Sequence, residues 1–344
     1  MKKVLIDKFV PFEGNPFEGI AEVQLLDPKE FTPGAVKDAD ALIVRTRTRC
    51  DAALLDGSKV SIVATATIGT DHFDFPYLNS RGIKTVSAPG CNAPAVAQYV
   101  HASILHLGLG QPGMCLGIVG LGHVGSIVAS WARSMGMEVL ACDPPRAARE
   151  HGWNPEAPLT EGDIPFVSLG DIGRKADVVT FHTPLTRTGD CPTFHLLDRD
   201  FLEIAPKALI INAARGPVAD TADLIAAIRR GRIDKAAIDC WEGEPRISTE
   251  LMDLAVIATP HIAGYSREGK ARATAISFNA VLEHFGSDRR INPGVPMVAP
   301  AAVTREAVLK SYDPIADSLP LRRDPLNFEI LRNTYPLRKE VYMD

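Results

Sequence analysis

Residues 115–125 read Cys-Leu-Gly-Ile-Val-Gly-Leu-Gly-His-Val-Gly, in which an apolar run leads into glycines with the spacing G-x-G-x-x-G. The run Cys115–Val119 predicts a buried strand, and a helix is expected from about Val124 to Met135. Glycines at such a turn allow a tight bend and a close approach of the backbone to a ligand, and the helix N-terminus offers free N–H groups to a phosphate. We therefore expect a dinucleotide-binding turn formed by Gly120, Gly122, His123, Val124 and Gly125.

An acidic residue stands at the position that this type of turn requires for binding a ribose. The next apolar run, Glu138–Cys142, ends immediately before Asp143, 21 residues after Gly122. The carboxylate would accept hydrogen bonds from the ribose hydroxyls of NAD and would repel the 2′-phosphate of NADP. NAD is therefore the expected cofactor. Arg146 could instead pair with a 2′-phosphate, and the sequence leaves its direction open.

The chain on both sides of this motif alternates short apolar runs with helix-length segments. Helices are predicted at Ala95–Leu109 and Ala222–Arg230, and residues 151–165 are predicted to form a loop. Further strands are predicted at Lys3–Asp7, Ala41–Arg45, Val60–Thr65, Ile83–Ser87, Val178–Phe181, Ala208–Asn212, Ala236–Asp239 and Val256–Ala258. Such alternation is typical of mainly parallel sheets covered by helices on both faces, and 344 residues suffice for two such domains.

The composition argues against several classes of protein. A formal net charge of −5 provides no basic field for nucleic acid, and no stretch has the length and apolar character of a membrane span. The N-terminus lacks the apolar core of a signal peptide. The six cysteines show neither C-x-x-C nor another paired short spacing, so we expect neither a zinc site nor disulfides. These features predict a cytoplasmic protein with a small-molecule substrate and no metal.

Three polar residues follow predicted strands at the edge where an open parallel sheet binds ligands. His261 could take a proton from a substrate hydroxyl, and Glu244 could hold the other imidazole nitrogen. Arg215 offers a planar pair of donors for a substrate carboxylate. Each residue alone could be structural, but their occurrence together behind a nucleotide motif predicts a catalytic set for the oxidation of a hydroxy acid.

At these residues the sequence resembles the D-2-hydroxyacid dehydrogenase family, which has the same order of Arg, Glu and His. The likeness extends over nearly the whole chain, and its clearest segments are Val44–Thr46, Ala64–His72, Ala88–Asn92, Cys142–Arg146, Phe181–Leu185, Trp241–Pro245 and His261–Ser266. Within the family these segments are most similar to members that act on a phosphorylated 2-hydroxy acid. One departure is Ala273, where glycine is expected.

The resemblance implies an α/β fold with two doubly wound parallel-sheet domains and a small C-terminal tail domain. A Rossmann nucleotide domain of residues 94–264 would be inserted in a flavodoxin-like substrate domain of residues 1–93 and 265–285. Prolines punctuate the chain beyond Phe285, and Phe328–Arg338 is similar to part of the family's dimerisation domain. Residues 286–344 are therefore expected to form a dimerisation segment, and the protein is expected to be a homodimer.

The resemblance also implies roles for individual residues. The catalytic residues would be Arg215, Glu244 and His261. Substrate would contact Thr46, Thr67 and Tyr265. Besides the glycine-rich turn, NAD would contact Asp143, Thr183, Ala213, Ala214, Arg215, Asp239 and Gly264. The basic candidates for a substrate phosphate are Arg45, Arg47, Arg49, Lys270 and Arg272, and the sequence does not choose among them.

Two alternatives to this interpretation stay open. The same machinery could act on 3-phosphoglycerate, glycerate or another D-2-hydroxy acid. The chain could also be an NAD-sensing binding protein on the same scaffold, since such proteins keep even the catalytic residues. The side chains of His72, His123 and His182 are interpreted as structural, although His123 also lies in the predicted cofactor turn.

Overall fold

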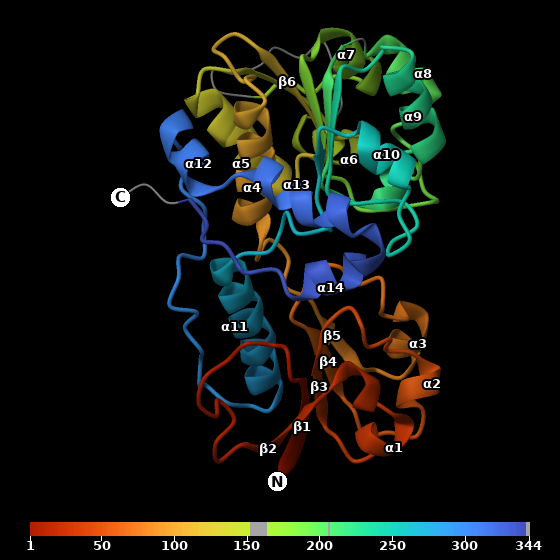
Figure 1. The fold of residues 1–344 in the computed structure, drawn as a ribbon. Coiled ribbons are helices and arrows are strands. Elements are labelled where there is room, and N and C mark those ends of the chain that lie inside the picture. The colour runs from red at the N-terminus through yellow and green to blue at the C-terminus, as the bar shows by residue number, and fades with distance from the viewer. Residues whose placement is uncertain (152–163, 206, 342–344) are drawn as a thin grey trace. The chain divides into compact units, whose positions relative to one another are not determined.

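The computed structural model describes residues 1–151, 164–205 and 207–341. The chain divides into two compact units, the first of residues 1–92 and 266–298 and the second of residues 93–265 and 299–344. The chain therefore passes from one unit to the other at residues 92–93, 265–266 and 298–299. Each unit is built around its own parallel sheet (Figure 1).

The first unit contains a five-stranded sheet in the order β2-β1-β3-β4-β5. This is the flavodoxin-like order 2-1-3-4-5, and every neighbouring pair is parallel. The strands are β1 (Lys2–Asp7), β2 (Ala21–Leu26), β3 (Ala41–Val44), β4 (Ile62–Thr65) and β5 (Lys84–Val86). The helices of this unit are α1 (Pro33–Val36), α2 (Ala52–Leu55), α3 (Phe75–Ser80) and α11 (Arg267–His284), with the 3-10 turn η1 (Pro28–Glu30).

Both faces of this sheet are buried, which explains the continuous apolar runs of its inner strands. Alternate residues of β1, such as Val4 and Ile6, pack with Phe278 and Val281 of α11 on one face. On the other face Leu5 packs with residues of α2 and α3. The period of two along each strand therefore separates one core from the other.

The second unit contains a six-stranded parallel sheet in the order β11-β10-β9-β8-β6-β7. Phe166 forms a further parallel bridge with Ala141 of β7. With that bridge as the third position, the first six positions follow the Rossmann order 3-2-1-4-5-6, and β11 adds a seventh position at the far edge. The strands are β6 (Cys115–Val119), β7 (Glu138–Cys142), β8 (Val178–Phe181), β9 (Leu209–Asn212), β10 (Lys235–Ile238) and β11 (Ile257–Ala258).

Helices cover both faces of this second sheet (Figure 1). One face packs against α4 (Ala93–His106) and α5 (His123–Ser134). The other face packs against α7 (Leu169–Lys175), α8 (Arg199–Ile204), α9 (Thr221–Arg229) and α10 (Thr249–Leu254). Residues 93–265 also contain α6 (Pro144–His151) and the 3-10 turn η2 (Gly216–Val218). The two doubly wound parallel sheets expected from the sequence are thus confirmed.

The C-terminal residues do not form a compact unit of their own. Residues 286–298 belong to the first unit and residues 299–344 to the second. The latter contain α12 (Arg305–Ser311), α13 (Pro314–Arg323), η3 (Pro325–Asn327) and α14 (Phe328–Asn333). The fully buried Leu321 and Phe328 join one core of the second sheet. This differs from the separate tail expected from the sequence, because apolar side chains between the prolines find a surface to pack on.

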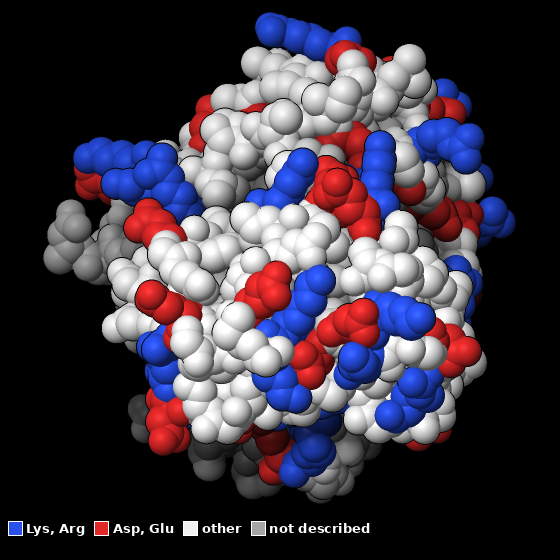
Figure 2. Space-filling view, turned by 90° about the horizontal axis from the view of Figure 1, so that it is seen from below, with Lys and Arg blue, Asp and Glu red and all other residues white. Residues whose placement is uncertain are grey.

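The expected strands are all present with ends shifted by at most two residues, and the three expected helices are α4, α5 and α9. Most of the loop predicted at 151–165 falls on residues 152–163, which lie outside the described residues. Figure 2 shows one face of the molecule, on which basic and acidic side chains are interspersed rather than gathered by sign. Among the described helices, none combines the length and apolar character needed to cross a membrane.

Candidate active site

The glycine-rich turn connects β6 to α5, as the sequence predicts. Gly120 has a φ of +93°, and a Cβ there would lie 2.9 Å from the backbone of His182. A Cβ on Gly125 would lie 2.1 Å from the carbonyl oxygen of Gly120, so a side chain would push the helix away from the turn. At Gly122 a Cβ would have no atom of the described residues within 4 Å. Gly120 and Gly125 are thus required by packing, whereas Gly122 leaves the backbone open to a ligand.

The N-terminus of α5 has the features of a phosphate site. Gly122 is its N-cap and provides no side chain to accept a hydrogen bond from the first turn. The helix has 12 residues, so its dipole places partial positive charge at this end. These residues fit the pyrophosphate of a dinucleotide.

Asp143 and Arg146 both turn toward this glycine-rich segment. The Asp143 carboxylate accepts hydrogen bonds from the amides of Leu121 at 2.8 Å and Arg146 at 3.0 Å. It keeps further lone pairs for ribose hydroxyls. The Arg146 guanidinium donates to the carbonyl oxygen of Leu121, to the hydroxyl of Ser126 at 2.8 Å and to Glu150 at 2.7 Å. The direction of Arg146, which the sequence left open, is therefore back along the turn.

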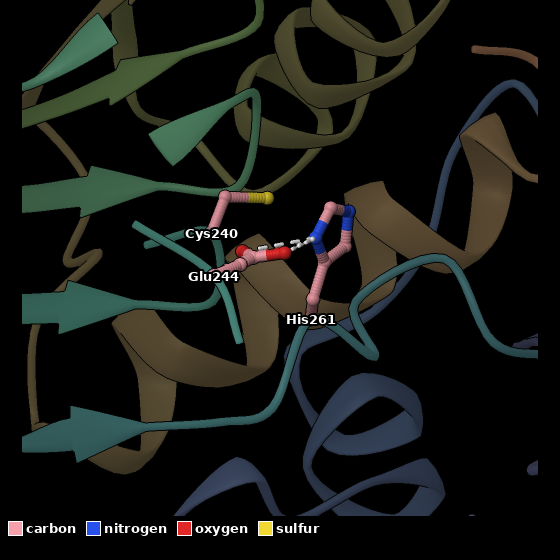
Figure 3. Close-up of side chains that lie close together, drawn as sticks. All are labelled: Cys240, Glu244 and His261. Atoms are coloured by element: carbon pink, nitrogen blue, oxygen red, sulfur yellow. Dashed lines mark hydrogen bonds and ion pairs between the residues drawn. The ribbon is translucent and has the colours of Figure 1, made fainter. Parts of the chain in front are cut away.

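His261 and Glu244 form a hydrogen-bonded pair (Figure 3). His261 Nδ1 lies 2.9 Å from Oε2 of Glu244 and 3.1 Å from Oε1. The Trp241 amide donates to Oε1 at 2.8 Å and fixes the carboxylate. Both side chains are largely buried, with 24% and 19% of their surfaces exposed. With the Nδ1 proton directed to Glu244, Nε2 of the neutral imidazole is the basic nitrogen.

Glu244 is held in its charged form. Burial alone would raise its pKa, but the neighbouring His261, the Trp241 amide and Arg332 together outweigh burial and lower the pKa below its usual value. Cys240 lies close to the pair (Figure 3). Its Sγ, a carboxylate oxygen of Glu244 and a ring nitrogen of His261 all lie within 4.8 Å of one another. Burial raises the pKa of the Cys240 thiol well above its usual value, and the thiol donates to the carbonyl oxygen of Ala214 at 3.4 Å. A neutral thiol is a poor metal ligand, so the expectation of no metal stays our prediction.

Asp239 organises the loop that carries His261. Its carboxylate accepts hydrogen bonds from the amides of Ile262 at 2.7 Å and Ala263 at 3.0 Å, and from the hydroxyl of Thr259 at 2.7 Å. His261 itself has a φ of +56°, a left-handed conformation that is uncommon outside glycine. Both oxygens of the buried Asp239 are engaged by the loop that carries His261, and its direct contact with NAD stays a prediction.

Arg215 lies on the loop after β9, at the same carboxyl edge of the sheet as Glu244. The side chain of Asn212 donates to the Arg215 carbonyl oxygen at 3.0 Å, and Arg215 Nη1 donates to the carbonyl oxygen of Ala214 at 2.8 Å. The loops of Arg215 and Glu244 touch, because a Cβ on Gly216 would lie 1.9 Å from the carbonyl oxygen of Trp241. This contact fixes the separation of the proposed carboxylate clamp and the acid–base pair.

The other residues expected to contact the cofactor lie on loops of the second unit. The Thr183 hydroxyl is buried and has no hydrogen-bond partner among the described residues, which suits a group completed by a bound ligand. Ala213 follows β9, and Gly264 follows the two amides that Asp239 holds. Their contacts with NAD stay predictions.

The residues expected to bind substrate are divided between the two units. Thr46 and Thr67 follow β3 and β4 of the first unit. The Thr67 hydroxyl is hydrogen-bonded to that of Thr65 at 2.7 Å. Tyr265 is the last residue of the second unit before the chain enters α11. Its hydroxyl accepts a hydrogen bond from Arg332 at 3.2 Å.

Three of the basic candidates for a substrate phosphate have structural partners. Arg45 pairs with the fully buried Asp7 at 3.0 Å, and Arg49 pairs with Asp51 at 2.7 Å. Arg272 is buried and donates to the carbonyl oxygens of Cys91 at 2.7 Å and Pro296 at 2.8 Å. These contacts occupy part of the hydrogen-bonding capacity of the three guanidinium groups.

Two arginines of the C-terminal residues also reach the site, and sequence reasoning missed them. Arg332 of α14 contacts Tyr265 and lies 3.8 Å from Glu244. Arg338 donates to the carbonyl oxygens of Ile262 at 3.0 Å, Tyr265 at 3.3 Å and Ala263. Only their basic character within Phe328–Arg338 could have drawn attention to them, since pairs separated by more than sixty residues leave no local pattern.

Known proteins resemble this chain at both the sequence and the structural level. Residues 99–263 match the family described as D-isomer specific 2-hydroxyacid dehydrogenase, NAD binding domain. Erythronate-4-phosphate dehydrogenase of Bacteroides fragilis is 45% identical over 98% of this chain and 97% of its own length. The protein of the same name from Porphyromonas gingivalis is 38% identical over 98% of this chain and 94% of its own length.

Solved structures share the fold. The TT0316 protein from Thermus thermophilus has a TM-score of 0.67 and 26% identity, covering 86% of this chain and all of its own. D-lactate dehydrogenase from Aquifex aeolicus, solved with NAD and lactic acid, has a TM-score of 0.63 and 22% identity, covering 82% of this chain and 95% of its own.

Proposed function

Because the chain belongs to the D-isomer specific 2-hydroxyacid dehydrogenase family, in the group of the erythronate-4-phosphate dehydrogenases, we propose that it oxidises 4-phospho-D-erythronate to 2-oxo-3-hydroxy-4-phosphobutanoate. In this proposal the reaction is a step of vitamin B6 (pyridoxal phosphate) biosynthesis in the cytoplasm. The chain is an NAD-dependent dehydrogenase that acts on a CH–OH group. The observation that carries the proposal is the hydrogen bond between His261 and Glu244. The loop of Glu244 touches the loop of Arg215, so the three proposed catalytic residues lie in one region. The chain also resembles these enzymes over nearly its full length.

The proposed mechanism assigns one task to each residue of the site. Arg215 binds the substrate carboxylate with its planar guanidinium and so orients the C2 carbon. Nε2 of His261 accepts the proton of the C2 hydroxyl as the carbon–oxygen double bond forms. Glu244 stabilises the resulting imidazolium through Nδ1, at 2.9 Å. In the reverse direction the imidazolium returns this proton to the oxo group.

Bound NAD supplies the acceptor for the hydride that leaves C2. The residues that would hold it are the α5 N-terminus for the pyrophosphate, Asp143 for the ribose and Thr183 through its unpartnered hydroxyl. The space that the described residues leave at Gly122 is consistent with this placement. The turn, the acid and the orphaned hydroxyl thus fit a dinucleotide.

An NADH-formation assay across candidate acids tests the substrate. We expect 4-phosphoerythronate to give the highest kcat/KM among itself, 3-phosphoglycerate, D-glycerate and D-lactate. A higher value for any of the other three would refute the proposed substrate and leave the dehydrogenase assignment in place. A His261→Gln variant is the matched control, because it retains the fold-determining residues of the nucleotide domain and should lose turnover with every acid.

We further propose that the protein is a homodimer joined through its C-terminal residues. These residues expose several large apolar side chains, namely Leu309, Ile315, Leu319, Leu326 and Ile330. Exposed apolar side chains gathered on one segment are characteristic of interaction surfaces. Light scattering should give about twice the chain mass of 37.1 kDa, and the double change Leu326→Glu and Ile330→Glu should shift the protein to monomers. A wild-type mass near that of one chain would refute this.

A further inference from the structure

The C-terminal arginines differ in what they contact. Arg322 donates to the carbonyl oxygens of Met252 at 2.7 Å and Ala255, and Arg338 likewise binds main-chain carbonyl oxygens of the His261 loop. Such contacts fasten one segment of chain to another. Arg332 instead contacts the side chains of Tyr265 and Glu244, at 3.2 and 3.8 Å.

Arg332 reaches these side chains from a well-anchored helix. Phe328, at the start of α14, is fully buried in the core of the second unit. The side chain of Arg332 is 20% exposed, so its charge acts in a partly desolvated setting where electrostatic interactions are stronger than in water. Its guanidinium also lies 6.0 Å from the centre of the Tyr265 ring.

Glu244 therefore faces two cationic groups at once. His261 is hydrogen-bonded to the carboxylate, and the guanidinium of Arg332 approaches the same oxygen, Oε2, at 3.8 Å. The other charged or titratable groups around the pair are Cys240, the buried carboxyl of Asp239, Arg215 and Tyr265. Two cations that share one anion repel each other, so Arg332 must disfavour the imidazolium form of His261.

We propose that Arg332 is a positioning residue of the active site, which shares the Glu244 carboxylate with His261 and fixes the Tyr265 hydroxyl. The C-terminal tail then completes the acid–base centre instead of acting only as a dimerisation segment. The inference deepens the proposed function, since it assumes that His261 is the acid/base. It does not depend on which 2-hydroxy acid is the substrate.

The test removes the charge and follows His261 directly. NMR of protein with isotope-labelled histidine, assigned with His261→Gln, gives the midpoint of the imidazole titration without substrate. In Arg332→Gln this midpoint should rise by about 0.5 to 1 pH unit, because the change removes a partly screened cation that opposes the charge on the imidazolium. Arg332→Lys keeps the positive charge, so the midpoint of its His261 titration should stay close to that of the wild type.

Arg322→Gln is the matched control, because it loosens the same tail without touching Glu244. Its midpoint should equal that of the wild type. An unmoved midpoint in Arg332→Gln, or an equal shift in Arg322→Gln, would overturn the proposal. If Arg332→Gln fails to fold, Arg332→Met removes the same charge and is judged by the same criteria.

Kinetics separates this inference from the proposed function. The midpoint of the oxidation profile, measured with whichever 2-hydroxy acid the wild type oxidises, should rise in Arg332→Gln together with the NMR midpoint. A wild type that is inactive on 4-phosphoerythronate, with the NMR shift still present, would refute the substrate and support the role of Arg332. Activity on 4-phosphoerythronate without a shift of the NMR midpoint in Arg332→Gln would support the substrate and refute the role of Arg332.

Discussion

His261 Nδ1 lies 2.9 Å from Oε2 of Glu244, although the two residues are 17 positions apart and follow different strands. The contact arises because β10 and β11 are parallel neighbours, so the loops after them leave the sheet at the same edge. Asp239 then sets the path of the second loop by accepting hydrogen bonds from two of its amides. The acid–base pair is therefore a product of sheet order and of one buried carboxylate.

The cofactor preference can be tested at Asp143. We expect the wild type to prefer NAD to NADP by at least about tenfold in kcat/KM, equivalent to about 1.4 kcal/mol. Asp143→Ala should narrow the preference, because it removes the acceptor for the ribose hydroxyls and leaves Arg146 beside the turn. Steady-state kinetics with both cofactors measures this, and equal efficiency of the wild type with the two would contradict the role of Asp143.

Asp239→Asn should weaken the His261 loop. The amide group can accept from only one of the two backbone donors, Ile262 or Ala263, and presents N–H to the other. A buried donor left without a partner costs about 1–3 kcal/mol, so Tm should fall, and kcat should fall at least about tenfold as His261 moves. Tyr99→Phe removes only the hydrogen bond between the Tyr99 and Thr259 hydroxyls, which does not involve Asp239 directly. It serves as the control and should lower Tm and kcat less. Wild-type Tm and kcat in Asp239→Asn would contradict this account of the loop.

Acid should destabilise the second unit through His101. Burial lowers the pKa of His101 to about 4, and its Nε2 donates to the Val128 carbonyl oxygen at 2.9 Å. Since the unfolded chain takes up this proton near pH 6.5, stability is complete above that pH and is lost as pH falls toward 4. The loss for one such histidine is on the order of 2 kcal/mol at pH 5.

Thermal unfolding at a series of pH values measures this effect. Between pH 7 and pH 5, His101→Gln should lose less Tm than the wild type, because it cannot take up the proton. His123→Gln, at an exposed position, should keep the wild-type dependence. Parallel curves for His101→Gln and the wild type would exclude His101 as the cause.

Glu244→Gln tests the charge of the pair. The lowered pKa of Glu244 means that its carboxylate stays ionised across the working range and does not itself titrate there. Without this anion the imidazolium is less favoured, so the oxidation profile should shift to lower pH while kcat drops. Steady-state rates from about pH 5.5 to 9.5 would show the shift, and an unmoved profile would remove Glu244 from the proposed role.

Local sequence patterns predict the inner strands of both sheets because those strands are buried on two faces. The strand β2 escapes prediction because it lies at an edge, where Glu22 and Gln24 are exposed and interrupt the apolar run. The helices of residues 299–344 were not predicted for a different reason. Pro314 and Pro325 occupy first positions of helical turns, where proline is tolerated, so they mark beginnings and not breaks.

The site is predictable only where one motif or one strand end marks it. The glycine-rich turn and Asp143 have a fixed spacing, and Arg215, Glu244 and His261 each follow a recognisable strand. The contact of Arg332 with Glu244 spans 88 positions and depends on how α14 packs, which no local pattern encodes. The role of Asp239 could not be predicted either, because the sequence does not show that the loop after β11 turns back onto this carboxylate.

The most direct test of the central claim is the pH dependence of the reaction in both directions. If His261 is the acid/base, kcat/KM for hydroxy-acid oxidation should rise with pH, because the neutral imidazole accepts the proton. Reduction of the oxo acid should fall over the same window, because the imidazolium donates it. His261→Ala should lose on the order of 10² to 10⁴ in rate and abolish both dependences, with NAD affinity little changed. Profiles that run in the same direction, or a fully active His261→Ala, would contradict the account.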